Sequence, residues 1–165
     1  MRTSLTVNYN MKIDQIRYIL IGGLVAGALD ITFAISFAAF NGTPPLQLLR
    51  IVASGAFGKA ALNGGLPMAA FGLVAHFVLS LGWAGVYLLL VQLKPPLVRH
   101  AVIYGILFGI VVFFAMRLVV LPASAFPFPV RFKPLATALD LMSHMFLFGV
   151  PIALATRKAV KLHAT

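Results

Sequence analysis

A carboxylate and an imidazole stand four residues apart in the last long apolar run of the sequence. Asp140 and His144 can each bind and release a proton, and a spacing of four places them on one face of a helix. Because the residues around them are apolar, both side chains stand where an ionisable group is costly. The pair therefore marks the place where we expect any chemistry of this chain to occur.

Three more ionisable residues stand inside apolar runs, namely Asp30, His76 and Arg117. The chain has only three acidic residues, so most of its carboxylate side chains lie in apolar segments. It has no cysteine, which excludes disulfides, thiolate metal sites and cysteine nucleophiles. We predict that these three residues form an intramembrane polar cluster with Asp140 and His144. Each must face a neighbouring helix to avoid lipid.

The composition of the chain is that of a membrane protein. Of its 165 residues, 61% are hydrophobic and only 10% are charged, with a mean hydropathy of +1.01. Soluble domains have roughly 25% charged residues. Several apolar runs approach the roughly 20 residues with which a helix crosses a bilayer. We therefore predict an all-α integral membrane protein with a single membrane domain over residues 1–165.

Four apolar runs are long enough to span a membrane. The predicted transmembrane helices cover residues 18–40, 67–93, 101–121 and 135–155. Between the first two, residues 46–62 have the length of one short helix, but Arg50 and Lys59 stand too far apart for both to reach headgroups from a spanning helix. We expect an interfacial or re-entrant helix there, and the alternative is a fifth span.

Basic residues outside the predicted spans give an orientation. Eight stand on the side of the two termini: Arg2, Lys12, Arg17, Lys94, Arg99, Arg157, Lys158 and Lys161. Four stand on the other side: Arg50, Lys59, Arg131 and Lys133. The positive-inside rule then predicts that the N- and C-termini are both cytoplasmic. The net charge of +10 is explained by anionic lipid headgroups and topology, so we expect no nucleic acid partner.

The polar residues fall at two depths when the rise of about 1.5 Å per residue is counted along each span. Asp30, His76 and His144 should lie near the middle of the bilayer. Arg117 and Asp140 should form a shallower layer on the outer side, where they can pair. The last helix would then join both layers.

Each of these residues also has a purely structural interpretation. Arg117 can extend to outer headgroups, and the two histidines can be satisfied by a backbone carbonyl or by a hydroxyl such as that of Ser80. Asp30 is the hardest to explain in this way, because a carboxylate in mid-span costs about 3 kcal/mol. We expect Asp30 to be protonated and hydrogen-bonded to a histidine.

The second half of the chain carries a set of residues that identifies a protein family more specifically than the hydropathy pattern does. The set comprises His76, Phe77, Ser80, Ala84, Tyr87, Pro95, Gly105, Gly109, Pro122 and His144. With this set, roughly residues 70–150 resemble the YagU-like family of small bacterial inner-membrane proteins. The resemblance implies a four-span architecture in the bacterial inner membrane and no established biochemical activity. Roles for Asp30, Arg117 and Asp140 rest on this sequence and not on the family.

Several functions are compatible with these residues. The first is a protein that handles protons or a solute through the polar cluster, and the second is a structural or accessory subunit that binds a protein partner or a second copy. A metal- or haem-binding bundle is a third, disfavoured because no H-x-x-x-H spacing is present. An enzyme is also disfavoured, since no serine has an evident base. We predict no catalytic residue, cofactor or metal ligand.

Overall fold

The computed structural model describes the backbone of residues 13–161 and the side chains of residues 16–160. Arg2 and Lys12, which enter the predicted orientation, lie outside the described residues, as does the side chain of Lys161. The described part of the chain contains helices and no strand. The all-α prediction is therefore confirmed.

The helices join into four long rods with a short helical segment between the first and the second. In chain order the elements are α1 (Ile13–Phe40), α2 (Pro45–Phe57), η1 (Gly58–Asn63), α3 (Gly65–Leu93), η2 (Pro95–Val98), α4 (Ala101–Ala115), η3 (Met116–Val120), α5 (Leu121–Ala123), α6 (Pro134–Met142), η4 (Ser143–Gly149) and α7 (Val150–Lys161). Helices α4, η3 and α5 form one continuous rod, and α6, η4 and α7 form another.

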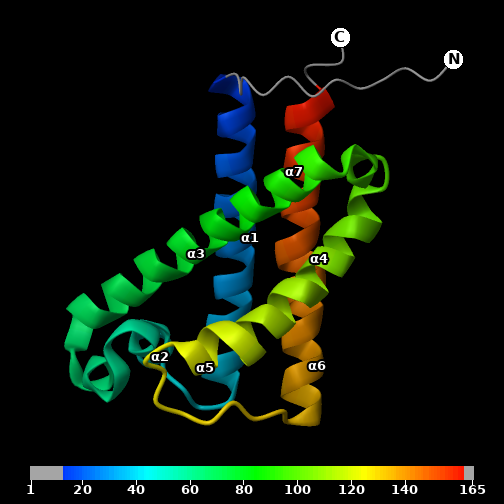
Figure 1. The fold of residues 1–165 in the computed structure, drawn as a ribbon. Helices are drawn as coiled ribbons and strands as arrows, with labels where there is room; N and C mark the ends of the chain where they lie inside the picture. The colour runs from blue at the N-terminus through cyan, green and yellow to red at the C-terminus, as the bar shows by residue number, and fades with distance from the viewer. Residues whose placement is uncertain (1–12, 162–165) are drawn as a thin grey trace, which may run out of the picture.

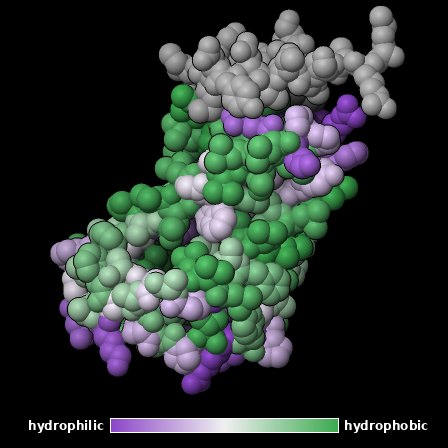
Figure 2. Space-filling model, in the orientation of Figure 1, coloured by the Kyte–Doolittle hydropathy of each residue, from purple (hydrophilic) through white to green (hydrophobic). Residues whose placement is uncertain are grey.

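All four rods are long and apolar enough to cross a membrane. The candidate spans are Ile16–Phe40, Gly65–Leu93, Ala101–Ala123 and Pro134–Val160, which confirms the four predicted spans with small extensions at their ends. Figure 2 shows a broad apolar belt with hydrophilic residues gathered above and below it. Large side chains in this belt, such as Val74 and Val119, expose more than half of their surface. Such a surface is suited to lipid rather than to water.

Prolines and one glycine set the ends of several helices. Pro45 and Pro134 stand in the first turns of α2 and α6, where a missing N–H is tolerated. Pro95 and Pro96 follow the end of α3 and begin the turn to α4. Gly58 closes α2 with a φ of 59°, a conformation that residues with a Cβ rarely adopt.

The rods pack in pairs through small residues. α1 lies against α7 and is crossed by α3, while α4 crosses η4 and α7 (Figure 1). At Gly27 of α1 a Cβ would lie 3.0 Å from the Ser80 hydroxyl of α3, and at Gly105 of α4 it would lie 2.8 Å from Cα of Val150. These glycines allow the helix backbones to approach each other closely.

The main apolar core lies in the half of the molecule near the two described chain ends. It is built around Tyr87, Phe108, Val112, Phe148 and Ile152, which come from α3, α4, η4 and α7. From the turn that joins them, α3 and α4 diverge toward the opposite end, and they share almost no close backbone contacts (Figure 1). The bundle is therefore closed at one end and splayed at the other.

Helix α2 and η1 occupy the splayed end. They pack against α3, where the carbonyl oxygen of Leu49 lies directly over Gly72. The segment has the position predicted for residues 46–62, and it is not among the helices long enough to span. With 13 residues, α2 is shorter than the roughly 20 residues with which a helix crosses a bilayer. The loop over residues 124–133 closes the same end of the molecule (Figure 1).

Candidate functional site

A cavity of about 700 Å³ opens between the diverging helices. Its walls come from α1, α2, α3, α4, η3, α5, the 124–133 loop, α6 and η4. The space exists because α3 and α4 pack against different helices and diverge from each other. Figure 2 shows the surface hollowed at mid-height within the apolar belt. Typical pockets for small organic ligands have volumes of about 300–1,000 Å³, and this cavity falls within that range.

All five residues of the predicted cluster line this one cavity, namely Asp30, His76, Arg117, Asp140 and His144. The remaining wall is mostly apolar and includes Leu48, Val52, Leu79, Phe113, Val120, Phe126 and Phe128. The sequence predicted an intramembrane polar cluster of these residues, and in the structure their side chains are not fully buried. The side chains of Asp30, His144, Arg117 and Asp140 remain between 13% and 33% exposed, because they face the open cavity.

Arg117 and Asp140 form an ion pair. Nη2 and Nε of Arg117 donate to Oδ2 of Asp140 at 2.6 and 3.2 Å, and Nη1 donates to the carbonyl oxygen of Arg131 at 3.1 Å. The guanidinium also lies over the rings of Phe113 and Phe132, at 5.0 and 5.5 Å from their centroids. The predicted pairing is therefore present, and Arg117 does not extend to headgroups. It ties η3 to α6 and to the loop.

A hydrogen bond to the backbone fixes the tautomer of the neutral His144 ring. Its Nδ1 lies 2.9 Å from the carbonyl oxygen of Asp140, so in the neutral ring Nδ1 carries the proton and Nε2 holds the lone pair. The same Nδ1 lies 3.3 Å from Oδ1 of Asp140 and 3.9 Å from Oδ1 of Asp30. A protonated His144 would therefore stand between two carboxylates.

Asp30 is bound by a hydroxyl and not by a histidine. Oγ of Ser143, which is buried, donates to Oδ1 of Asp30 at 2.8 Å, while the nearest nitrogen of His144 is 3.9 Å away. The expected hydrogen bond between Asp30 and a histidine is thus wrong. Ser143 was missed, although its place beside His144 in the same apolar run was a signal.

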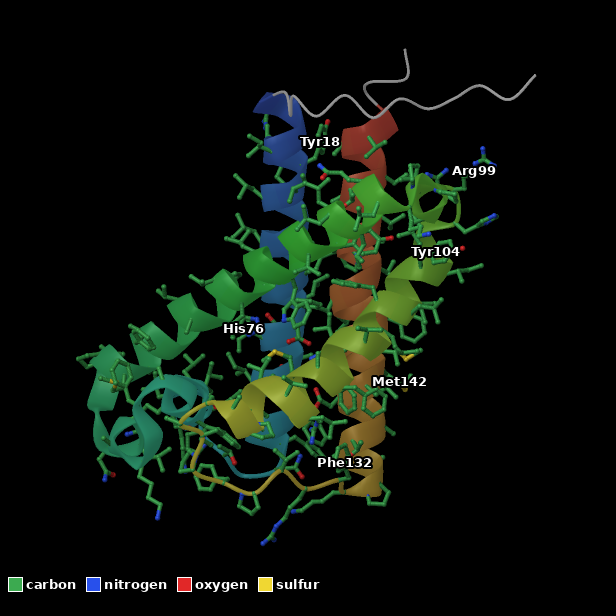
Figure 3. The ribbon with its side chains drawn as sticks, in the orientation of Figure 1. Tyr18, His76, Arg99, Tyr104, Phe132 and Met142 are labelled. Atoms are coloured by element: carbon green, nitrogen blue, oxygen red, sulfur yellow. The ribbon has the colours of Figure 1, made fainter. Side chains whose placement is uncertain are left out.

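His76 is satisfied by the backbone of α1. Its Nε2 lies 2.9 Å from the carbonyl oxygen of Gly27, and Figure 3 shows the side chain pointing from α3 toward α1. Among the described residues, no hydrogen bond joins His76 to Asp30 or His144. The three residues share a cavity wall, as their predicted depth implied, but His76 stands apart from the contacts around Asp30.

Some of the site's side chains sit on two π-helical segments, which sequence reasoning did not predict. Arg117 belongs to η3, and Ser143 and His144 belong to η4. A proline follows each segment two residues after its end, Pro122 and Pro151, and neither can supply the N–H that an α-helical register would use. π-Helical turns are often found at functional sites, since they turn side chains away from the regular spacing.

Comparison with known proteins adds no further constraint. The chain matches no protein-family model, no curated protein and no solved structure. Function is therefore argued from the cavity itself. Within residues 13–161, no three His, Asp, Glu or Cys side chains are grouped so as to hold a metal ion. What the site offers is a proton acceptor on His144, a carboxylate on Asp30, and an apolar chamber beside them.

Proposed function

We propose that this chain is a bacterial inner-membrane protein that handles protons or a small solute through its cavity, and that it belongs with the YagU-like proteins. The observation that supports this proposal is that five ionisable side chains, contributed by all four rods, line one chamber inside an apolar belt. Ionisable groups at membrane depth are costly and typically mark the path of a proton, an ion or a substrate.

The proposed orientation places the described ends of α1 and α7 in the cytoplasm. The turn with Lys94 and Arg99 lies at the same end of the molecule as those two helix ends, while α2 and the loop with Arg131 and Lys133 lie at the opposite end (Figure 1). The cytoplasmic end then has the larger number of basic residues, as the positive-inside rule requires. Anionic headgroups are the proposed partners of these residues.

The roles within the site follow from the contacts. His144 takes and releases a proton at Nε2, since its Nδ1 is committed to the carbonyl of Asp140. Asp30 supplies a negative charge 3.9 Å away that favours the protonated ring. Arg117 with Asp140 forms the wall on the outer side and holds the 124–133 loop over the cavity.

Proton flux into liposomes tests this proposal. Purified protein is reconstituted with a pH-sensitive dye inside the vesicles, and the rate of acidification is measured after an outward potassium gradient sets the membrane potential. His144→Gln is expected to reduce the flux about tenfold or more, because positioned proton-transfer groups contribute at least that much. His100→Gln is the control, since His100 is exposed in the turn between α3 and α4.

A structural or accessory role is the second candidate. It is favoured by the ion pair of Arg117, which holds η3, α6 and the loop together in the way that polar contacts fix helix register. In this case a protein partner or a second copy would bind the bundle. Substitutions at the ion pair would then abolish assembly, while His144→Gln would leave every measured flux unchanged.

A further inference from the structure

The charges along the cavity wall are unevenly balanced. The charge of Arg117 is neutralised by Asp140 at 2.6 Å, and its Nη1 donates to the carbonyl oxygen of Arg131, so its positive charge is already matched within the chain. Arg131 is exposed at the outer end, where water and salt screen its charge. Among the described residues, Asp30 has no cationic partner within 4 Å apart from His144, and only when that ring is protonated.

Among the described residues, only one of the two carboxylate oxygens of Asp30 accepts a hydrogen bond. Ser143 donates to Oδ1, and no described residue donates to Oδ2. The side chain lines the cavity and remains 13% exposed. An ionised carboxylate in this position would be stabilised by a positive charge beside it, and the described part of the chain supplies one only by protonating a histidine.

The rest of the wall favours an apolar ligand of considerable size. Leu79, Val52 and Val120 provide aliphatic surface, and Phe113, Phe126 and Phe128 provide aromatic rings that attract cations. The volume of about 700 Å³ far exceeds what a bare metal ion needs. Within the described residues the carboxylates and imidazoles are also not grouped as a metal site.

We propose that the cavity binds a lipophilic organic cation, with its charge beside Asp30 and its apolar groups against the aromatic wall, in exchange for the proton of His144. This inference rests on the proposed proton handling and names the substrate class. The exchange keeps the charge constant, because the ligand brings one positive charge as the imidazolium releases one. Both cannot occupy the space next to Asp30 without placing two cations against a single carboxylate.

The titratable and charged groups that face this exchange come from five of the elements around the cavity. They are Asp30 from α1, His76 from α3, Arg117 from η3, Arg131 from the loop and Asp140 from α6. His76 is bound to the carbonyl oxygen of Gly27, and Arg117 and Asp140 neutralise each other. Protonation of His144 therefore remains as the event that changes the charge beside the ligand. Binding of the cation should weaken as the pH falls.

Tetraphenylphosphonium and tetraphenylborate provide a matched pair of probes, since they have the same shape and opposite charges. Binding is measured by equilibrium dialysis against the full-length protein in lipid nanodiscs, with empty nanodiscs subtracted. We expect saturable binding of the phosphonium, no saturable binding of the borate, and a loss of phosphonium affinity of about tenfold or more in Asp30→Asn. Ser36→Ala, at an exposed position of α1, should bind as the wild type does.

A second variant keeps the test valid if Asp30→Asn folds poorly. Leu79→Trp places an indole in the cavity wall and should reduce binding, whereas Val78→Trp, one residue away and absent from the wall, should not. Equal binding of both probes, or wild-type affinity in Leu79→Trp, would overturn the inference. If His144-dependent proton flux is observed without phosphonium binding, the inference fails and the proposed proton handling stands. Saturable phosphonium binding without any proton flux, even when a phosphonium gradient is applied across the liposomes, would contradict the proposed proton handling and would also rule out the exchange.

Discussion

Nδ1 of His144 lies 2.9 Å from the carbonyl oxygen of Asp140 and 3.9 Å from the carboxylate of Asp30. The first contact belongs to one helix and fixes the tautomer of the ring, whereas the second crosses from η4 to α1. The ring can therefore gain a proton at Nε2 without losing its place, and the new charge is met by a carboxylate of another helix. This relationship is the basis of the proposed proton exchange.

Loss of the guanidinium should leave Asp140 as an unpaired charge in the cavity wall. We expect Arg117→Gln to lower the free energy of unfolding by about 1–3 kcal/mol, less than for a fully buried pair because both side chains are partly exposed. The double variant Arg117→Gln with Asp140→Asn should regain part of the loss, since no charge is then unpaired. Thermal unfolding in detergent measures both. Wild-type stability in Arg117→Gln would show that the pairing contributes nothing, and no recovery in the double variant would show that an unpaired Asp140 carries no cost.

Gly109 should not tolerate a side chain. A Cβ at this position would overlap the carbonyl oxygen of His144, so Gly109→Ala is expected to push α4 away from η4 and to cost about 1–3 kcal/mol. Gly82→Ala is the control, because no atom lies within 4 Å of its added Cβ and alanine favours a helix. A thermal midpoint for Gly109→Ala equal to that of Gly82→Ala would contradict the close packing at this site.

Removal of the Ser143 hydroxyl should lower the proton flux without abolishing it. In Ser143→Ala the carboxylate of Asp30 loses its hydrogen bond, and a lost bond to a charged group is worth about 1.5–3 kcal/mol. We expect a proton flux between those of the wild type and Asp30→Asn. Ser36→Ala, whose hydroxyl bonds only to the carbonyl of Thr32, should leave the flux unchanged. A Ser143→Ala flux indistinguishable from that of the wild type would show that Ser143 does not support proton transfer.

The orientation can be read from cysteine labelling, since the natural chain has no cysteine. Lys94 and Lys133 are exposed at opposite ends of the molecule. A membrane-impermeant maleimide applied to spheroplasts should label Lys133→Cys and should label Lys94→Cys only after permeabilisation. The reverse pattern would place the termini outside and invert the proposed topology.

Hydropathy and spacing predicted the parts of this structure that depend on single helices or on obligatory pairing. The four spans follow from length and apolarity, and the Arg117 and Asp140 pair follows from the cost of leaving either charge alone. The bond between Ser143 and Asp30 could not be predicted, because it depends on the π-helical turn of η4 and on how α1 lies against it. The cavity likewise results from the divergence of α3 and α4, which is a property of packing and not of either sequence segment.

The most direct measurement compares proton flux through the wild-type protein and through Asp30→Asn in the same liposomes at the same membrane potential. We predict flux above that of protein-free vesicles for the wild type and a decrease of about tenfold or more for the variant, because the imidazolium of His144 then loses the carboxylate that stabilises it. Equal flux in the two proteins, with both correctly folded by thermal unfolding, would contradict the proposal that this site moves protons.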